Sequence, residues 1–438
     1  MRARAASILL DLIDTRLPPP FADLSRHLHV EFPVRRLARA RTCWLNEGWF
    51  SQHGLPLDDE ATRASVEAAC AEAWGFAAPQ ESDPPDTFEG APFSAWADRY
   101  GAPSGSMHGG SGRTTTRGRF NVKGAGRTPL VSDGSDWYHT HGCMWLEEAI
   151  RETINATVAD ALFPLGAVPV VAVIDAGCRY RWRDGAVGAR RALVVRPAFL
   201  RVASLMRSIY FGSSGRVGSD QWIDAGRVAD LWTSCHDRRE PGRTLFKAFE
   251  AQGEQYGFGS MLRLWPGPPF ASNMTLDGRL VDFGSFRALR DWTRVQGEVS
   301  SHGFGREEAL IRAAARTLER LAGSFGRPLR TDELVERFEE GRAKGVRDAL
   351  HGHGVGVGSA DHDVIIRTWR AQQARTAPLH GAGEPADELP CLPRYPTLER
   401  EALLVRTQTF VDRLPDDDAA RAQEIRSFIE GRLAEVLS

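Results

Sequence analysis

The spacing of apolar residues predicts one long helix in the first half of the chain. Apolar side chains recur at every fourth position, which places them on one helix face: Leu146, Ile150, Ile154, Val158 and Leu162. Pro164 and Gly166 end this pattern, because neither residue favours a helix interior. We therefore expect a helix from about residue 146 to residue 162.

Shorter apolar runs on both sides of this helix predict strands. Residues 120–123 (Phe-Asn-Val-Lys) alternate between apolar and polar, as a short strand does. Residues 168–174 and 192–195 are rich in β-branched residues and are separated by an Asp-Gly turn at 184–185. Residues 101–118 are so dense in Gly, Ser and Thr that we expect no regular element there.

The two ends of the chain favour helices. Residues 1–77 carry helical stripes and are expected to form a helix-rich lead-in, followed by a breaker-rich surface connection to about residue 92. Beyond residue 200 most apolar patterns are helical, as at 310–321 and 425–433. The exception is residues 274–283, where an Asp277-Gly278 pair between short apolar runs predicts a two-residue hairpin turn.

Composition excludes several classes of function. The chain has 438 residues with 55 Lys+Arg against 57 Asp+Glu, so no overall positive field exists to recruit nucleic acid or an anionic membrane. With 42% hydrophobic and 26% charged residues, the chain is expected to be a soluble globular protein. No apolar stretch reaches the length of a membrane span. The six cysteines include no CxxC pair, which is typical of reduced thiols in the cytoplasm.

Lysine is rare, so its positions are informative. Almost all basic residues are arginine, and the only lysines are Lys123, Lys247 and Lys344. Lys123 follows a Gly-rich loop that carries Arg113, and it precedes the predicted helix, which carries Glu152 off its apolar stripe. A lysine ammonium can contact phosphate oxygens when a helix glutamate holds it by ion pairing. We interpret these residues as the first part of a phosphate-binding site.

Oxygen donors in the second half of the chain could complete such a site. Asn273 precedes the predicted hairpin turn, and Asp282 follows it at the start of Asp282-Phe283-Gly284. Magnesium takes oxygen ligands, one or two from protein and the rest from phosphate and water. A lone tripeptide of this kind could instead cap a helix, but its position after the lysine and the glutamate follows the order seen in kinases.

Four segments of the chain resemble the selenoprotein O family. The resemblance extends from about residue 109 to residue 286 and is carried by Lys123-Gly-Ala-Gly-Arg-Thr-Pro129, Ala149-Ile-Arg-Glu152, Arg196-Pro-Ala-Phe-Leu-Arg201, and Asn273-Met274 with Asp282-Phe-Gly-Ser-Phe286. It implies a protein-kinase-like fold that binds ATP flipped relative to ordinary kinases. It also implies transfer of AMP from ATP to hydroxyl side chains of proteins.

The resemblance gives roles to residues of the first half. Gly110, Gly112 and Arg113 match the family's nucleotide loop. Lys123 matches its phosphate-contacting lysine, and Glu152 matches the glutamate that holds this lysine.

Further matches lie on both sides of the helix and in the second half. Arg196 and Arg201 match two arginines that grip the flipped phosphates, and Asn273 and Asp282 keep the spacing of the family's metal ligands. The family also binds nucleotide through an Asp-Gly pair between the lysine and the helix. Either Asp133-Gly134 or His141-Gly142 could occupy that place, so only the glycine, which we assign to Gly142, is matched.

The chain departs from the family where a general base is expected. The family has an aspartate immediately before the metal-binding asparagine, and this chain has Ser272. Serine is a poor base at neutral pH, so base assistance worth about 10²- to 10⁴-fold would have to come from elsewhere. Asp277 is close in sequence, but its expected role is that of the turn residue.

A possible soft-metal site is a weaker alternative. Residues 138–143 (Tyr-His-Thr-His-Gly-Cys) contain histidine and cysteine, but no second cluster in the sequence completes a tetrahedral zinc site. Ordinary loop histidines are the favoured interpretation.

These patterns together predict an α+β protein with a bilobal, protein-kinase-like fold. We expect a helical N-terminal extension and linker at 1–92, a small mixed lobe at 93–206 and a mainly helical lobe at 207–438. The expected function is a cytoplasmic nucleotidyltransferase that binds ATP with Mg²⁺, or with Mn²⁺, and transfers AMP to a hydroxyl group of a protein, peptide or small molecule. Two alternatives remain: a specialised ATP-dependent enzyme of peptide or natural-product modification, and a catalytically inactive ATP-binding scaffold.

Overall fold

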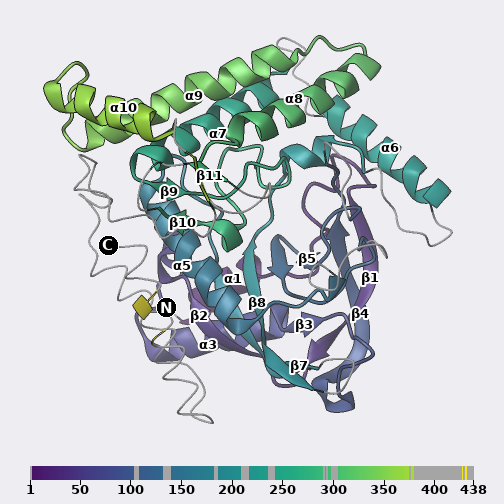
Figure 1. Ribbon diagram of the computed structural model, residues 1–438. Coiled ribbons are helices and arrows are strands. Elements are labelled where there is room, and N and C mark those ends of the chain that lie inside the picture. Colours follow the sequence, from purple (N-terminus) through teal and green to yellow (C-terminus); the bar gives the residue numbers. More distant parts are fainter. Residues whose placement is uncertain are drawn as a thin grey trace.

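The computed structural model of the protein has a mixed α+β architecture (Figure 1). The structure describes residues 2–102, 108–131, 140–181, 186–208, 217–234, 242–289, 292, 294–296, 304–373, 376–378, 427, 430 and 431. In Figure 1 most of the strands lie in the lower part of the molecule, and helices α7, α8 and α9 lie above them.

An eight-stranded antiparallel sheet organises the first half of the chain. Its spatial order is β2-β7-β8-β6-β5-β4-β1-β3. The strands are β1 (His29–Leu37), β2 (Arg41–Leu45), β3 (Phe76–Ala77), β4 (Phe88–Asp98), β5 (Thr114–Arg117), β6 (Phe120–Lys123), β7 (Ala172–Arg181) and β8 (Val187–Pro197).

Helices α1, α2, α3 and α5 pack against the large sheet, and helices make up most of the second half of the described chain. The described helices are α1 (Arg2–Leu12), α2 (Glu47–Gln52), α3 (Glu60–Trp74), α5 (Leu146–Leu162), α6 (Val217–Ser234), α7 (Arg243–Met261), α8 (Glu307–Ser324), α9 (Thr331–Gly352) and α10 (Ala360–Gln373). Two small sheets pair β9 (Leu264–Trp265) with β10 (Arg287–Ala288), and β11 (Arg294–Gln296) with β12 (Thr376–Pro378). Short 3₁₀ helices are η1 (Pro85–Thr87), η2 (Val202–Leu205) and η3 (Phe283–Ser285).

Side-chain alternation along the strands separates two apolar cores. Val194 of β8 and Val173 of β7 pack with Ile150 and Ile154 of α5 on one face of the sheet. The neighbouring strand residues point to the opposite face, where they pack with α1, α2 and α3: Val122, Ile174, Leu193 and Val195. Lys123 at the end of β6 and Arg196 on β8 lie on the face that α5 covers, the same face as Val194.

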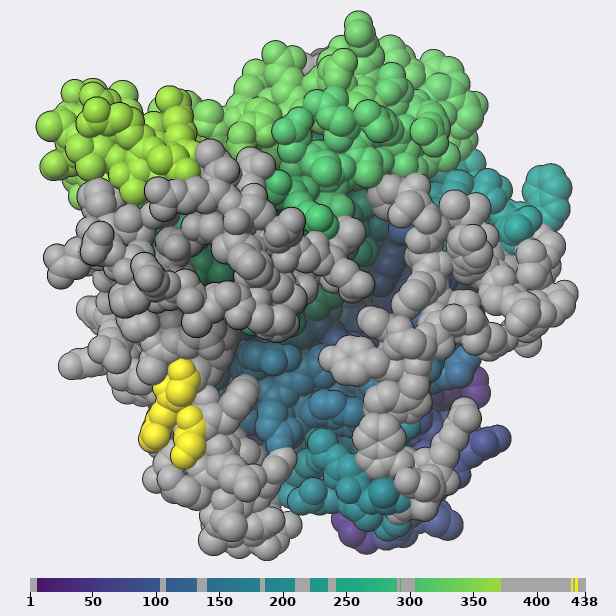
Figure 2. Space-filling model, in the orientation of Figure 1, coloured from purple at the N-terminus to yellow at the C-terminus, as the bar shows by residue number. Residues whose placement is uncertain are grey.

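The second half is held together by a very close approach of α7 and α9. A β-carbon added at Gly253 of α7 would lie 1.9 Å from the Phe338 carbonyl oxygen of α9, so only glycine fits there. In the same way, a β-carbon added at Gly341 of α9 would lie 1.9 Å from the Glu250 carbonyl oxygen of α7. In Figure 2 the green atoms of this helical half lie above the blue and teal atoms of the sheet.

Several predicted elements are confirmed. Helix α5 has the predicted bounds, β6 coincides with the predicted strand at 120–123, and α8 contains the predicted pattern at 310–321. The strand expected at 168–174 begins only at Ala172, because the preceding residues contain Pro169 and run as irregular chain.

Two predictions of secondary structure hold only in part. The lead-in contains the expected helices, α1, α2 and α3, but residues 29–37 and 41–45 are strands, because pairing with β4 and β7 satisfies their backbone groups. Residues 101–118 were expected to lack regular structure, but residues 114–117 form β5 through pairing with β6. The predicted Asp-Gly turn at 184–185 and the C-terminal helix at 425–433 involve residues outside the described part of the chain.

A membrane-spanning helix was not expected from the sequence. Within the described residues, the structure contains no helix that is both long and apolar enough to cross a bilayer.

Candidate functional site

The candidate site begins with a buried ion pair between β6 and α5. Lys123 is the last residue of β6 and lies opposite Val194 of β8, so its side chain points to the face covered by α5. There its Nζ atom lies 2.5 Å from Oε2 of Glu152, whose side chain is 1% exposed. The predicted pairing of these two residues is therefore present.

Asp282 from the second half of the chain contacts the same ammonium group. Its Oδ1 atom lies 2.8 Å from Lys123 Nζ, and 39% of its side chain remains exposed. The following Phe283 is buried, and its carbonyl oxygen accepts a 3.0 Å hydrogen bond from Asn155 Nδ2 of α5. This bond ties the Asp282 segment to the helix that carries Glu152.

The surrounding charges stabilise the ionised form of Asp282. The Lys123 ammonium holds the pKa of this carboxyl well below its usual range; burial opposes the effect, and Arg196 reinforces it. Asp282 also adopts a left-handed backbone conformation, with φ of 65°. Such a conformation is uncommon for a residue other than glycine and is often found at functional sites.

Arg196 adds a second cation to the Glu152 carboxylate. It lies near the end of β8, is 2% exposed, and its Nη1 atom lies 3.2 Å from Glu152 Oε1. Burial lowers the pKa of this guanidinium, whereas Glu152 raises it. Its Nε atom is buried and has no hydrogen-bond acceptor within the described residues. A buried donor without an acceptor is costly, so Arg196 has capacity for an anionic ligand.

Arg113 is held by a carboxylate that sequence reasoning missed. Its Nη2 atom lies 2.8 Å from Oε1 of Glu148, one turn before Glu152 on α5. Burial opposes ionisation of Arg113, but Glu148 and then Asp282 raise its pKa above the usual value. The signal in the sequence was the four-residue spacing of Glu148 and Glu152, which places both on one helix face.

Arg201 is positioned by backbone pairing with the Asp277 turn. Arg201 forms an isolated antiparallel bridge with Thr275, and its Nη1 atom donates to the Ser272 carbonyl oxygen. Its guanidinium lies 4.6 Å from the centroid of the Phe199 ring, and that of Arg196 lies 5.2 Å from the same ring. The two predicted phosphate-gripping arginines therefore share one aromatic neighbour.

The predicted turn brings the two metal-ligand candidates to its ends. Met274 and Leu280 form an isolated antiparallel bridge, and the Gly278 amide donates to the Thr275 carbonyl at 3.3 Å. A turn is present here, but the predicted two-residue hairpin turn was wrong in length: the bridge encloses the five residues 275–279, and the turn bond spans residues 275–278. Asn273 and Asp282 flank the bridge, and Asn273 Nδ2 lies 3.4 Å from the Pro268 carbonyl oxygen.

Asp277 is occupied by the turn itself. Its Oδ1 atom accepts a 2.7 Å hydrogen bond from Thr275 Oγ1, and its Oδ2 atom lies 2.7 Å from Arg279 Nη2. Burial raises the pKa of Asp277, but the bonds from Arg279 and Thr275 lower it more. A carboxylate with a lowered pKa is a weak proton acceptor, so Asp277 does not compensate for Ser272.

Two of the predicted nucleotide-binding glycines have a packing role. A β-carbon at Gly110, where φ is 154°, would lie 2.1 Å from the Asp98 carbonyl oxygen. A β-carbon at Gly142, where φ is 71°, would lie 2.1 Å from the Arg127 amide nitrogen. Gly112 is less restricted, with its nearest neighbour at 3.3 Å. Contact of these glycines with a nucleotide stays a prediction.

The possible soft-metal segment contains an ordinary buried histidine. His141 Nδ1 accepts a 3.0 Å hydrogen bond from the Cys143 amide, and its ring stacks on Trp145. Residues 132–139 lie outside the described part, including the Asp133-Gly134 alternative. Among the described residues there is no group of three or more His, Cys, Asp or Glu side chains that could hold a metal ion.

Comparison with known proteins gives the chain no family. No protein-family model matches it, and no curated protein matches it either. The site itself gathers four cations against three carboxylates: Lys123, Arg113, Arg196 and Arg201 against Glu148, Glu152 and Asp282. Such a cluster can bind an anion and hold a partly exposed carboxylate beside it.

Proposed function

We propose that this protein is a nucleotidyltransferase that binds ATP with magnesium and transfers AMP to a hydroxyl group. The observation that carries the proposal is the position of Lys123 Nζ between Glu152 and Asp282. In kinase-like enzymes a lysine held by a helix glutamate contacts phosphates, beside an aspartate that binds the metal. The resemblance of these segments to the selenoprotein O family supports AMP transfer over phosphate transfer.

In this proposal the cations of the site hold the triphosphate. Glu152 fixes Lys123, and Glu148 fixes Arg113, so both side chains are ordered before the ligand arrives. Arg196 supplies a buried Nε donor, and the guanidinium of Arg201 lies against the same Phe199 ring. Arginine is suited to bidentate contacts with phosphate oxygens.

Asp282 and Asn273 are the residues that would hold the metal ion. A carboxylate and an amide oxygen suit magnesium, and also manganese, both of which prefer oxygen ligands. Asp282 fits this role because its carboxylate is ionised, partly exposed and adjacent to the phosphate-binding lysine. The metal supplies neutralisation of phosphate charge when it is bound.

The proposed reaction forms one bond and breaks one bond at the α-phosphorus. The acceptor oxygen bonds to the α-phosphorus, the bond from this atom to the bridging oxygen breaks, and pyrophosphate leaves. The hydroxyl proton passes to solvent, since Ser272 stands at the family's base position and Asp277 is bound to Arg279. Phosphate-transfer reactions depend mainly on positioning and electrostatics, so such a site can retain turnover.

We further propose that the sheet-containing and helical halves correspond to the two lobes of a kinase-like fold. The ion pair of Lys123 with Asp282 and the bridge of Arg201 with Thr275 join these halves. Reduced cysteines support a cytoplasmic location: Cys43, Cys70, Cys143 and Cys178 are all free thiols.

Labelled ATP tests this function directly. With [α-³²P]ATP and magnesium, label should become attached to protein, peptide or a small hydroxyl acceptor, with release of pyrophosphate. With [γ-³²P]ATP no label should be transferred. Transfer of the γ-phosphate instead would identify a kinase and overturn the proposal.

A second candidate function is an ATP-binding scaffold without turnover. It is favoured by Ser272 and by the engagement of Asp277 with Thr275 and Arg279, which leave no base among the residues of the turn. Binding of Mg-ATP without any label transfer, even with a broad set of peptide acceptors, would support this alternative. Transfer confined to one peptide or small molecule would instead support a specialised modification enzyme.

A further inference from the structure

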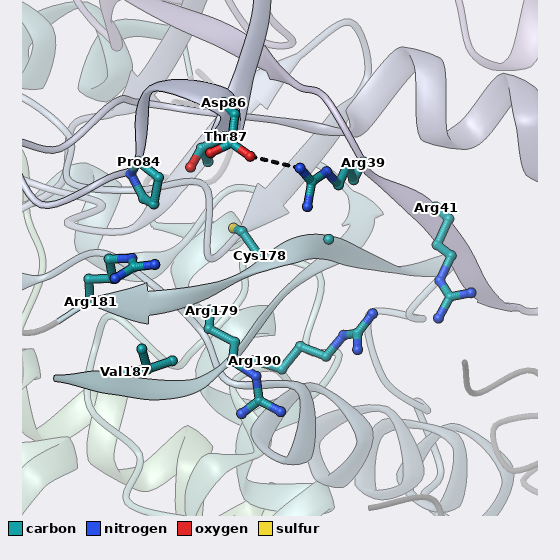
Figure 3. Close-up of a pocket in the computed structure, with 11 residues that line it drawn as sticks. Arg39, Arg41, Pro84, Asp86, Thr87, Cys178, Arg179, Arg181, Val187 and Arg190 are labelled. Atoms are coloured by element: carbon teal, nitrogen blue, oxygen red, sulfur yellow. Dashed lines mark hydrogen bonds and ion pairs between the residues drawn. The ribbon is translucent and has the colours of Figure 1, made fainter. Parts of the chain in front are cut away.

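A second site for anions lies at the edge of the sheet formed by β2, β7 and β8. A cavity of about 730 Å³ opens there, lined by five arginines: Arg39, Arg41, Arg179, Arg181 and Arg190. Figure 3 shows these side chains around the hollow, with Arg181 and Arg41 at opposite ends and the Cys178 thiol between them. Cavities of this size accommodate ligands as large as a nucleotide.

This cavity is separate from the Lys123 site. Arg190 and Arg196 are both on β8, and six residues of extended strand span about 20 Å. Arg196 belongs to the Lys123 site, whereas Arg190 lines the cavity. A single small ligand therefore does not reach both places.

The protein neutralises only part of the positive charge. Asp175, whose side chain is 1% exposed, pairs with Arg190 at 2.6 Å and with Arg41 at 3.1 Å. Arg39 pairs with Asp86, which lies 2.7 Å away. Among the described residues that line the cavity, Asp86 is the only one with a carboxylate.

Further donors in this cavity lack acceptors. Within the described part of the chain, Arg179 and Arg181 are exposed and form no ion pair. The Nη2 atom of Arg41 is buried and has no hydrogen-bond acceptor among those residues. An unsatisfied buried donor of an ionised side chain is costly, so an anion in the cavity would stabilise it.

Backbone irregularity builds the cavity. The register of β7 with β8 shifts between Asp175 and Arg179, which is the signature of a bulge. Inside the bulge Gly177 has φ of 66°, and a β-carbon there would lie 2.2 Å from the Arg39 carbonyl oxygen. The β1–β2 connection therefore closes on β7 at this point, which brings Arg39 and Arg41 to the arginines of β7 and β8.

We propose that this cavity binds a free small molecule carrying two or more phosphate groups. Planar guanidinium groups make paired hydrogen bonds to phosphate oxygens, and several of them surround one volume here. The concave shape favours a compact ligand over the extended contact of an acidic peptide or a membrane surface.

The test uses inorganic tripolyphosphate without magnesium, titrated by calorimetry into the full chain. The double variant Arg179→Gln/Arg181→Gln should raise the dissociation constant at least about tenfold, because both side chains are unpaired within the described residues. The matched control is Arg316→Gln/Arg320→Gln, which removes the same charge from the exposed face of α8 and should leave the constant unchanged. All these arginines are exposed, so the unfolding temperature should be unaffected in both variants.

Other probes distinguish this site from the alternatives. Lys123→Ala should retain the tripolyphosphate affinity that Arg179→Gln/Arg181→Gln loses, which separates this site from the proposed ATP site. Absence of tripolyphosphate binding, or equal loss in the control, would overturn the proposal. Two further results would overturn it. One is a polyglutamate peptide of the same charge that binds the protein as tightly as tripolyphosphate does. The other is a protein that binds only to vesicles containing phosphatidylinositol bisphosphate and not to free tripolyphosphate.

Discussion

Lys123 and Asp282 are separated by 159 positions in the sequence, and their side chains form an ion pair of 2.8 Å. Glu152 of α5 pairs with the same ammonium, 2.5 Å away. A strand lysine, a helix glutamate and a turn aspartate thus meet at one point, and each has a distinct consequence when it is replaced.

Replacing Glu152 by glutamine should impair the site more than replacing Glu148. Glu152 neutralises both Lys123 and Arg196, whereas Glu148 holds only Arg113 among the cations of the site. A neutral group of similar shape weakens buried charged hydrogen bonds by about 1.5 to 3 kcal/mol. We expect Glu152→Gln to lower both the free energy of unfolding and the rate of AMP transfer. We expect Glu148→Gln to weaken nucleotide affinity more than it lowers the free energy of unfolding. Equal effects on stability, measured by chemical denaturation, would contradict the assigned roles.

Replacing Asp282 by asparagine should remove metal dependence without unfolding the protein. The side chain is 39% exposed, so the fold tolerates the neutral isostere, but a neutral amide is a weak magnesium ligand. Transfer should fall by about 100-fold or more, since the metal supplies several kcal/mol of charge stabilisation. The measurement is the rate of label transfer against magnesium concentration. An Asp282→Asn protein with an unchanged magnesium profile would show that the metal binds elsewhere.

The stability of the protein should depend on the charge of Asp282 at acid pH. Lys123 lowers the pKa of this carboxyl from its ordinary value of 3.8, and burial opposes this shift. A carboxyl with a lowered pKa in the folded state stabilises the fold above its unfolded pKa, and this contribution is lost as the pH falls through the folded pKa.

The difference in unfolding free energy between the wild type and Asp282→Asn should therefore shrink as the pH falls below 3.8. Denaturation of both proteins in buffers from about pH 6 to pH 2 measures this difference. Asp98 and Asp277 also have lowered pKa values, so the variant should keep part of the acid sensitivity. A difference that grows on acidification would contradict the pairing of Asp282 with Lys123.

Restoring a carboxylate at Ser272 should accelerate transfer. Ser272 lies next to Asn273, and Asp277 is held by Thr275 and Arg279. If only the base is missing, Ser272→Asp should raise the rate by about 10²- to 10⁴-fold. The matched control is Ser272→Asn, because asparagine has nearly the shape of aspartate but cannot act as a base. An equal response of the two variants in the labelled-ATP assay would show that Ser272 does not occupy a base position.

Local patterns account for what the sequence predicted well. The four-residue apolar repeat gave the bounds of α5 because burial on one face is decided within the helix itself. The Asp277-Gly278 pair predicted the place of a turn but not its length, since glycine tolerates the φ of 82° found at Gly278 in turns of several lengths.

Long-range pairing explains what the sequence did not reveal. The strands at 29–37 and 41–45 are stabilised by β4 and β7, which lie far along the chain. A local signal was also missed, because Val30, Phe32 and Val34 have the two-residue apolar spacing of a strand. Contact of Arg113 with Glu148 depends on the course of a Gly-rich loop, which residue types do not specify. The arginine cavity likewise arises from a bulge in β7 that brings separate segments together.

Nucleotide binding by a lysine variant tests the central claim most directly. Calorimetric titration of Mg-ATP should show an affinity for Lys123→Ala at least about tenfold weaker than that of the wild type, because the variant loses the buried charge that we propose contacts phosphate. Lys247→Ala is the matched control, since Lys247 is exposed on α7 and should bind Mg-ATP as the wild type does. Thermal unfolding identifies any loss of fold, and Asp282→Asn then serves as the second variant. Unchanged Mg-ATP affinity in folded Lys123→Ala would contradict the placement of the triphosphate at this cluster.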